Sequence, residues 1–201
     1  MYHKQFRNGI YSAILIWLLN MLYLYLAGKF SDNGYVYWGA GIIPAAAAAV
    51  ISYLSNHDFK DLGFYPKHLK QDSIVMCCML VIELLIGVYM FRMSWAHAIR
   101  SWLYYVFWIA MQEEIIYRGF IQSHLFSPRI NRKVSYLIGA ALFAASHIPY
   151  QMQIRSWDGL FTAQLCITFF VHLLYCWIIE KRGNICIPWA LHVAADFLEV
   201  V

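Results

Sequence analysis

Charged side chains are scarce in this sequence of 201 residues, where Asp, Glu, Lys and Arg together make up 13%. An average soluble domain contains about 25% charged residues. Hydrophobic residues reach 62% of the chain, and the mean hydropathy is +0.54. This composition excludes an ordinary soluble domain and indicates a chain whose main solvent is the hydrocarbon layer of a membrane.

The usual signatures of metal and redox sites are also absent. The sequence contains no C-x-x-C pair and no H-E-x-x-H motif, although zinc-binding chains commonly carry one of them. The five cysteines all lie in apolar runs, so we expect them to be buried packing residues: Cys77, Cys78, Cys166, Cys176 and Cys186. No internal repeat, low-complexity tract or soluble appendage is visible, which predicts a single membrane domain over residues 1–201.

The chain instead contains long apolar runs bounded by charge, glycine and proline. A helix needs roughly 20 mostly apolar residues to cross a bilayer. The runs predict an all-α, polytopic transmembrane helical bundle of about seven spans: 9–28, 35–55, 73–91, 100–126, 133–150, 159–179 and 183–200. No A-x-A-like cleavage site follows the first run, which favours a retained span over a removed signal peptide.

The basic residues between these runs are distributed unequally, which predicts the orientation of the bundle. Ten fall on the side of the N-terminus: Lys4, Arg7, Lys60, Lys67, Lys70, Arg129, Arg132, Lys133, Lys181 and Arg182. Four fall on the opposite side: Lys29, Arg92, Arg100 and Arg155. Because cytoplasmic loops carry the excess of Lys and Arg, the N-terminus is predicted to be cytoplasmic. The net charge of +4 then reflects topology, and no nucleic-acid partner is expected.

Acids and bases inside apolar runs are functional candidates, because an ionised side chain in a bilayer costs at least a few kcal/mol. The strongest group lies in the fourth run. Glu114 and Arg118 are four residues apart, so they share a helix face and can neutralise one another. Glu113 is rotated by about 100° from Glu114 and is free to face a cavity. Glu113 is therefore the better candidate for a general base.

Two later runs carry pairs with the same spacing of four residues. Phe143 and His147 share a face in the fifth run, and His192 and Asp196 share a face in the last run. The helical rise per residue places His192 near the middle of the membrane, at the depth of the two glutamates, and His147 roughly 8 Å outward of the middle, a gap that helix tilt can close. Three helices that bring such residues together can activate a water molecule and stabilise an oxyanion, which fits peptide-bond hydrolysis.

Taken in order, the three motifs resemble those of the CAAX-processing and bacteriocin-processing (CPBP, or Abi-like) family of intramembrane endopeptidases, which includes the type II CAAX prenyl proteases. The matching residues are Glu-Glu-x-x-x-Arg at Glu113, Glu114 and Arg118, Phe-x-x-x-His at Phe143 and His147, and His-x-x-x-Asp at His192 and Asp196. Each motif is weak alone, whereas three in order on separate runs are specific. The peptidase core would cover about residues 100–201.

The resemblance implies a glutamate-type endopeptidase, without a covalent acyl intermediate, in a bacterial cell membrane. It also implies a peptide or protein substrate reached at the membrane lipid, either prenylated or of the bacteriocin or leader-peptide type. The implied roles are water activation by Glu113 and His147, oxyanion stabilisation by His192 and Asp196, and orientation of the site by Glu114 and Arg118. Asp196 stands where many relatives carry Asn.

Several alternatives stay open at this point. The polar residues would also suit an ion-pair network that fastens helices, a non-catalytic bacteriocin self-immunity protein, or a transporter or proton relay. The resemblance predicts no cofactor. A zinc-dependent site is the other reading, because four residues are competent zinc ligands: Glu113, His147, His192 and Asp196.

One connection and several other polar residues also allow structural predictions. The connection Asn56–Asp72 mixes basic and apolar residues, which predicts either a segment lying on the membrane surface or a solvated loop. Glu83 is expected to have a structural role. Asn20, His172 and Gln164 are expected to form hydrogen bonds between helices, and His97 and His124 are expected at the membrane interface.

Overall fold

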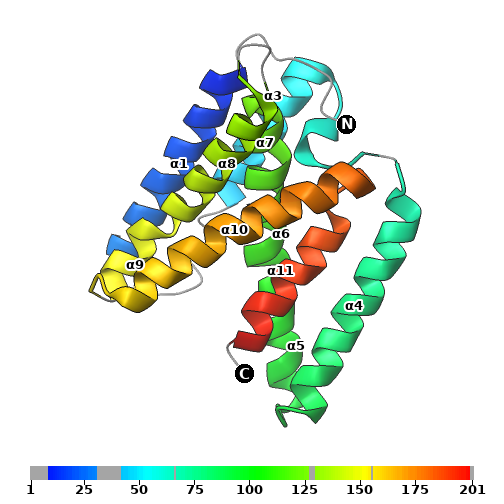
Figure 1. Ribbon diagram of the computed structural model, residues 1–201. Coiled ribbons are helices and arrows are strands. Elements are labelled where there is room, and N and C mark those ends of the chain that lie inside the picture. Colours follow the sequence, from blue (N-terminus) through cyan, green and yellow to red (C-terminus); the bar gives the residue numbers. More distant parts are fainter. Residues whose placement is uncertain (1–8, 31–41, 66, 127–129, 155, 200–201) are drawn as a thin grey trace.

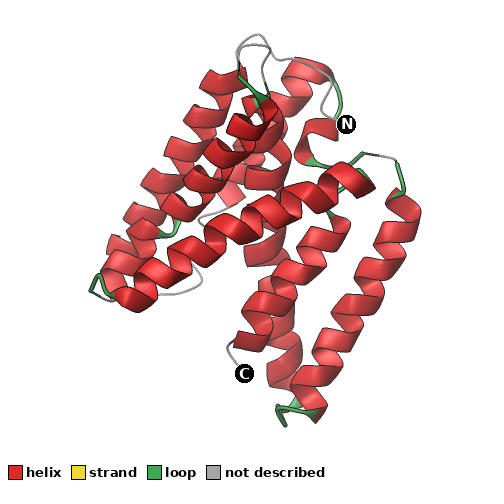
Figure 2. Ribbon diagram, viewed as in Figure 1, coloured by secondary structure: helices red, strands yellow, loops and turns green. Residues whose placement is uncertain are grey.

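The computed structural model describes residues 9–30, 42–65, 67–126, 130–154 and 156–199. Within these ranges the regular elements are helices, and extended pairing is limited to one isolated bridge between Phe64 and Asn184 (Figure 2). The all-α prediction is confirmed for this part of the chain. Four basic residues used to predict the orientation lie outside the described residues: Lys4, Arg7, Arg129 and Arg155.

The helices follow the predicted apolar runs closely. Outside the fourth run they are α1 (Gly9–Phe30), α3 (Ile42–Asn56), the 3₁₀ turn η1 (Lys60–Leu62), α4 (Leu69–Tyr89), α8 (Arg132–Ser146), α9 (Ile148–Ile154), α10 (Gly159–Arg182) and α11 (Cys186–Glu199). The fourth run forms one continuous helix of five parts: α5 (Trp95–Leu103), η2 (Tyr104–Ala110), α6 (Met111–Glu113), η3 (Glu114–Ile121) and α7 (Gln122–Leu125). Both η2 and η3 are π-helical, with wider turns than an α-helix.

In the part of the chain that the structure describes, three helices are long and apolar enough to cross a membrane on their own, in the windows Gly9–Leu26, Leu69–Tyr89 and Gly159–Arg182. Their outward surfaces are apolar, with Leu160 at 72% exposure and Phe170 at 66%. Such surfaces suit lipid, and the helices indicate an integral membrane protein. The count of seven spans stays a prediction, because α3 and α11 are shorter apolar helices.

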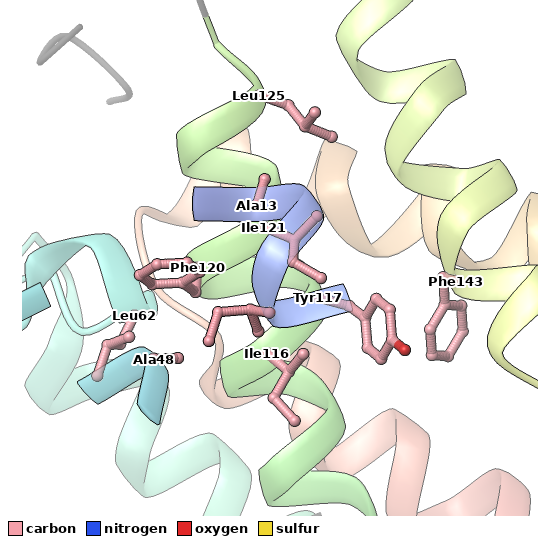
Figure 3. Packing of buried hydrophobic residues seen from close by; sticks show 10 residues of the cluster. Ala13, Ala48, Leu62, Ile116, Tyr117, Phe120, Ile121, Leu125 and Phe143 are labelled. Carbon is pink, nitrogen blue, oxygen red and sulfur yellow. The ribbon is translucent and has the colours of Figure 1, made fainter. Parts of the chain in front are cut away.

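The continuous helix of residues 95–125 runs through the bundle, with α5 beside α4 at one end and α7 beside α1 and α8 at the other (Figure 1), and it contributes to two hydrophobic clusters. Its first half packs with α4 and α11 in one cluster: Leu80, Val106, Ala110, Ala190, Val193 and Phe197. Its second half packs with α1, α3 and α8 in the other, which Figure 3 shows around Tyr117 and Phe143. Along this helix, Ala110 is the last residue of the first cluster and Ile116 is the first residue of the second. Glu113 and Glu114 lie between them. They therefore lie at the junction of two well-packed regions.

Part of the connection between α3 and α4 packs into the bundle, whereas Phe59 and Lys60 on it are exposed, so the surface segment and the solvated loop both stay predictions. Asp61 is 3% exposed and accepts a hydrogen bond from the Ser52 hydroxyl. The backbone of Leu62 lies so close to Gly119 that a side chain at that position would collide with it. His124 is also buried, with its Nε2 3.7 Å from Asp61 Oδ2, and its depth at the membrane interface stays a prediction. Internal hydrogen bonds make this burial possible.

The prediction that all five cysteines are buried is wrong for three of them. Cys176 and Cys186 are buried, whereas Cys77, Cys78 and Cys166 are exposed on α4 and α10. Free cysteine is usually buried in soluble proteins because its side chain is apolar and avoids water. A side chain exposed on an apolar span faces lipid instead of water, so burial brings little further gain.

Candidate active site

A cavity of about 320 Å³ lies beside the junction of the two hydrophobic clusters. Side chains from α1, the 95–125 helix, α8, α9, α10 and α11 line it. Four of the six predicted site residues are on its wall: Glu113, His147, His192 and Asp196. The cavity therefore gathers the residues of three separate sequence motifs.

The two adjacent glutamates face different surroundings, as their rotation on the helix predicts. Trp108, Ile109, Glu113 and Ile116 lie on the cavity side of the helix. The Glu113 side chain is 31% exposed and the Glu114 side chain is fully buried. One carboxylate can thus meet a ligand in the cavity, while the other is held inside the protein.

Glu114 forms the predicted ion pair with Arg118 in the interior. Glu114 Oε1 lies 3.1 Å from Arg118 Nη1, and both side chains are fully buried. The guanidinium carbon lies 3.8 Å from the centroid of the Phe143 ring and 5.2 Å from that of Tyr175. Phe143 of the second motif therefore contributes an aromatic face to the buried cation.

His192 connects the acids of the first and third motifs. Its Nδ1 lies 2.9 Å from Glu114 Oε1, and because a carboxylate oxygen accepts, Nδ1 is the donor in this bond. Its Nε2 lies 3.6 Å from Glu113 Oε2 and 3.5 Å from Asp196 Oδ2. The imidazole is therefore oriented by Glu114, with its second nitrogen directed toward the two carboxylates of the cavity wall.

His147 lies at the point where α8 ends. Its Nδ1 is 3.0 Å from the carbonyl oxygen of Phe143 and donates to it, so Nε2 of the neutral ring is an acceptor. The predicted span 133–150 is interrupted here, because α8 ends at Ser146 and α9 starts at Ile148. Pro149 disfavours a continuous α-helix through the residue before it. The interruption places His147 at a helix terminus on the cavity wall.

A match to a known family agrees with this geometry. Residues 94–198, just over half of the chain, match the family model described as type II CAAX prenyl endopeptidase Rce1-like. The chain belongs to this family. The Rce1-like segment starts at the N-cap of α5, ends in α11 and includes all six predicted site residues. No curated protein and no solved structure matches the chain.

Membership in the Rce1-like family confirms the resemblance that the three motifs indicated. It implies protease activity of the CAAX type in a membrane, with a peptide or protein as the substrate. The roles of individual residues in this Rce1-like chain stay predictions, as does the metal-free site. Among the described residues, no group of three or more His, Cys, Asp and Glu side chains is arranged to hold a metal ion.

Two features around the Rce1-like site were missed by the sequence analysis. Tyr175 packs against Arg118 from α10, and only tertiary contacts reveal it. Gln112 lines the cavity beside Glu113, and its position next to the first motif was the available signal. The expected interhelical hydrogen bonds are confirmed for two residues: Asn20 donates to the Tyr117 hydroxyl at 2.7 Å, and His172 Nε2 lies 3.2 Å from Gln122 Oε1.

Proposed function

We propose that this Rce1-like chain is a glutamate-type intramembrane endopeptidase that cleaves a peptide or protein at the bilayer by direct attack of water. The observation that supports this most is the shared cavity wall of Glu113, His147, His192 and Asp196. The buried Glu114–Arg118 pair stands directly behind it, in contact with His192. A base, a second proton acceptor and a donor for an oxyanion thus surround a space of about 320 Å³.

In the proposed reaction, Glu113 and His147 activate the water. Glu113 is the carboxylate open to the cavity, and His147 presents Nε2 as an acceptor because its Nδ1–H is bonded to Phe143. The water transfers a proton to this base pair while its oxygen attacks the scissile carbonyl carbon. The same proton then passes to the leaving amine when the tetrahedral intermediate breaks its C–N bond.

His192 is the proposed oxyanion donor. Its Nδ1–H is bonded to Glu114, so a protonated ring presents Nε2–H toward the cavity, where an oxyanion can accept from it alongside Asp196. Asp196 lies 3.5 Å from that nitrogen and holds the ring as an acceptor. In a site poor in water, a preoriented donor aimed at developing negative charge lowers the barrier strongly.

Glu114 and Arg118 are proposed to position the site rather than to react. Arg118 neutralises Glu114, and Glu114 fixes the orientation of His192 through its 2.9 Å hydrogen bond. A buried carboxylate without a cation would be costly. Because both side chains are fully buried, Glu114 stays ionised beside Arg118 while water and substrate exchange in the cavity.

For the substrate, we propose either a prenylated CAAX-type peptide or a bacteriocin or leader-type peptide, and for the location a bacterial cell membrane with a cytoplasmic N-terminus. The family description supports the first substrate class. Basic residues support the cytoplasmic N-terminus, because cytoplasmic ends of membrane helices carry the excess of Lys and Arg. They lie in the first turns of α4 and α8 and in the last turn of α10: Lys70, Arg132, Lys133, Lys181 and Arg182.

The proposal is tested by incubating the purified protein, reconstituted in lipid vesicles, with two probes. One is an S-farnesylated peptide ending in Cys, two aliphatic residues and Met, and the other is an unprenylated leader-type peptide. Products are identified by mass spectrometry. We expect cleavage of at least one probe by the wild type and none by Glu113→Gln, because an amide cannot act as the base.

Glu83 provides a matched control, since it is a membrane glutamate that is 5% exposed but does not line the cavity. Glu83→Gln is expected to retain activity. Wild-type turnover by a folded Glu113→Gln variant would rule out the mechanism. A folded wild type that cleaves neither probe would overturn the proposal and favour a non-catalytic immunity protein of the same fold.

A further inference from the structure

The two ends of the helical bundle differ in charge. Arg132 in the first turn of α8 pairs with Glu180 near the end of α10. Asp72 in the first turn of α4 accepts a hydrogen bond from Arg182 in the last turn of α10. These contacts join three helix termini at the end of the bundle where α1 begins (Figure 1). We call it the basic end, because these described residues lie there: Lys60, Lys67, Lys70, Arg132, Lys133, Lys181 and Arg182.

The cavity wall is built from the parts of the helices that lie away from the basic end. Leu24 belongs to the second half of α1, which begins at the basic end. Gln164 belongs to the first half of α10, which runs toward the basic end. His147 follows the last residue of α8. On the central helix, the described wall residues stop at Ile116, and the helix then continues through α7 toward the basic end.

Tight packing separates the cavity from the basic end. Every residue from Ile116 to Phe126 is buried. The backbone of Leu62 lies against Gly119, in the middle of this stretch. The bridge between Phe64 and Asn184 joins the connection before α4 to the segment between α10 and α11. In the part of the chain that the structure describes, side chains and backbone therefore fill the space between the site and the basic end.

The wall is open toward the opposite end of the bundle. Trp108 is 44% exposed and Tyr150 is 36% exposed, and both line the cavity. At about 1.5 Å per residue, Trp108 lies about 7.5 Å from Glu113 along the helix, toward the opposite end. The side chains of Glu113 and Asp196 remain 31% and 27% exposed. Because ionisable residues inside a membrane face the bundle interior or a water-filled cavity, this opening supplies water to the site.

The charge of the two ends gives this opening a side of the membrane. Cytoplasmic ends of membrane helices carry the excess of Lys and Arg. The basic end carries the larger set of described basic residues, and the opposite end carries Lys29, Arg92 and Arg100. In the orientation proposed above, the basic end faces the cytoplasm. The cavity then opens away from the cytoplasm.

We propose that the active-site cavity opens to the extracytoplasmic side of the membrane, and that the substrate is a polypeptide delivered to that side. An exported peptide of the leader or bacteriocin type fits this route. A peptide confined to the cytoplasm, prenylated or not, does not reach the opening. The inference rests on the proposed peptidase function and orientation, and it narrows the substrate class.

The direction of the opening is tested by chemical labelling, which does not depend on cleavage. Trp108→Cys and Lys60→Cys are introduced separately into the full chain, since Trp108 lines the opening and the Lys60 side chain is 53% exposed at the basic end. Right-side-out and inverted vesicles from bacterial cells are treated with a membrane-impermeant maleimide. The label needs a thiolate in water, and the unchanged protein gives the background from the native cysteines. We expect Trp108→Cys to react in right-side-out vesicles and Lys60→Cys in inverted ones.

The side of the substrate is tested with the unchanged protein in the same two preparations. A charged, membrane-impermeant leader-type peptide carrying a fluorophore and a quencher is added outside the vesicles. We expect cleavage by right-side-out vesicles, loss of cleavage in inverted vesicles, and recovery when detergent opens the inverted vesicles. Glu113→Gln vesicles of both kinds control for other proteases in the membrane.

The proposal is overturned if Trp108→Cys reacts in inverted vesicles or in neither preparation. Cleavage by intact inverted vesicles at the rate of right-side-out vesicles, or faster, would overturn it too. Failure of the proposed function looks different, because the labelling is then as expected while the peptide stays uncut in both preparations and in detergent. That result refutes the peptidase and leaves the direction of the opening standing.

Discussion

Arg118→Ala tests whether the buried ion pair supports the bundle as well as the site. Arg118 and Glu114 are both fully buried, and their charged atoms lie 3.1 Å apart. Truncation leaves the Glu114 carboxylate in a region with little water. It also removes the guanidinium from the face of Phe143, where it lies 3.8 Å from the ring centroid.

The structure sets the expected magnitude. Removing one partner of a buried pair costs about 3–5 kcal/mol. His192 Nδ1, still 2.9 Å from Glu114, keeps one partner for the carboxylate and favours the lower end. The lost cation–π contact, worth roughly 0.5–2 kcal/mol, favours the upper end. A loss of about 4 kcal/mol, at about 2–4 °C per kcal/mol for a chain of this size, lowers the Tm by roughly 8–16 °C.

The assay is thermal unfolding of the protein in detergent, with Arg132→Ala as the matched control. Arg132 pairs with Glu180, but its side chain is 56% exposed. Exposed pairs contribute about 0–1 kcal/mol, so this control should unfold within about 4 °C of the wild type. An unchanged Tm for Arg118→Ala, or equal decreases for both variants, would refute the importance of the buried pair.

Three further outcomes are expected. Cleavage should survive dialysis against a strong chelator, since a carboxylate-held water needs no metal; activity lost and then restored by zinc alone would contradict this. Asp196→Asn should keep most of kcat/KM across pH 5–9 and Asp196→Leu should lose at least about tenfold, because an acceptor oxygen holds His192; equal values for all three proteins would remove Asp196 from the site. Gly119→Val should destabilise the bundle by about 1–3 kcal/mol through collision with Leu62, unlike Gly159→Ala, which has open space around it; equal Tm values would refute the close packing.

Local spacing was sufficient to predict the first part of the site. The contact between Glu114 and Arg118 and the turn of Glu113 toward the cavity depend on positions within one helix. The hydrogen bond between His192 and Glu114 joins residues 78 apart in sequence. Helix spacing indicates which residues share a face, but it does not define how two helices meet. That contact, and the packing of Tyr175, required tertiary structure.

The connection before α4 shows a second limit of sequence analysis. Its mixture of lysine and apolar residues predicted exposure, yet Asp61 is buried because Ser52 and His124 are close to its carboxylate. Composition cannot reveal partners that come from two other helices. The end of α8 was different, since Pro149 in the sequence was a local signal that the predicted span would be interrupted.

The π-helical stretch η3 makes the length of the first motif a constraint in its own right. A π turn holds more residues than an α turn, so η3 sets how the residues after it are rotated relative to Glu113. Deleting one residue between Glu114 and Ile121 would rotate α7 by about 100° and turn the buried Gln122 and Leu125 away from their neighbours. Substitutions that keep size and polarity leave this rotation intact. Insertions and deletions do not, so the segment should tolerate conservative substitutions far better than changes of length.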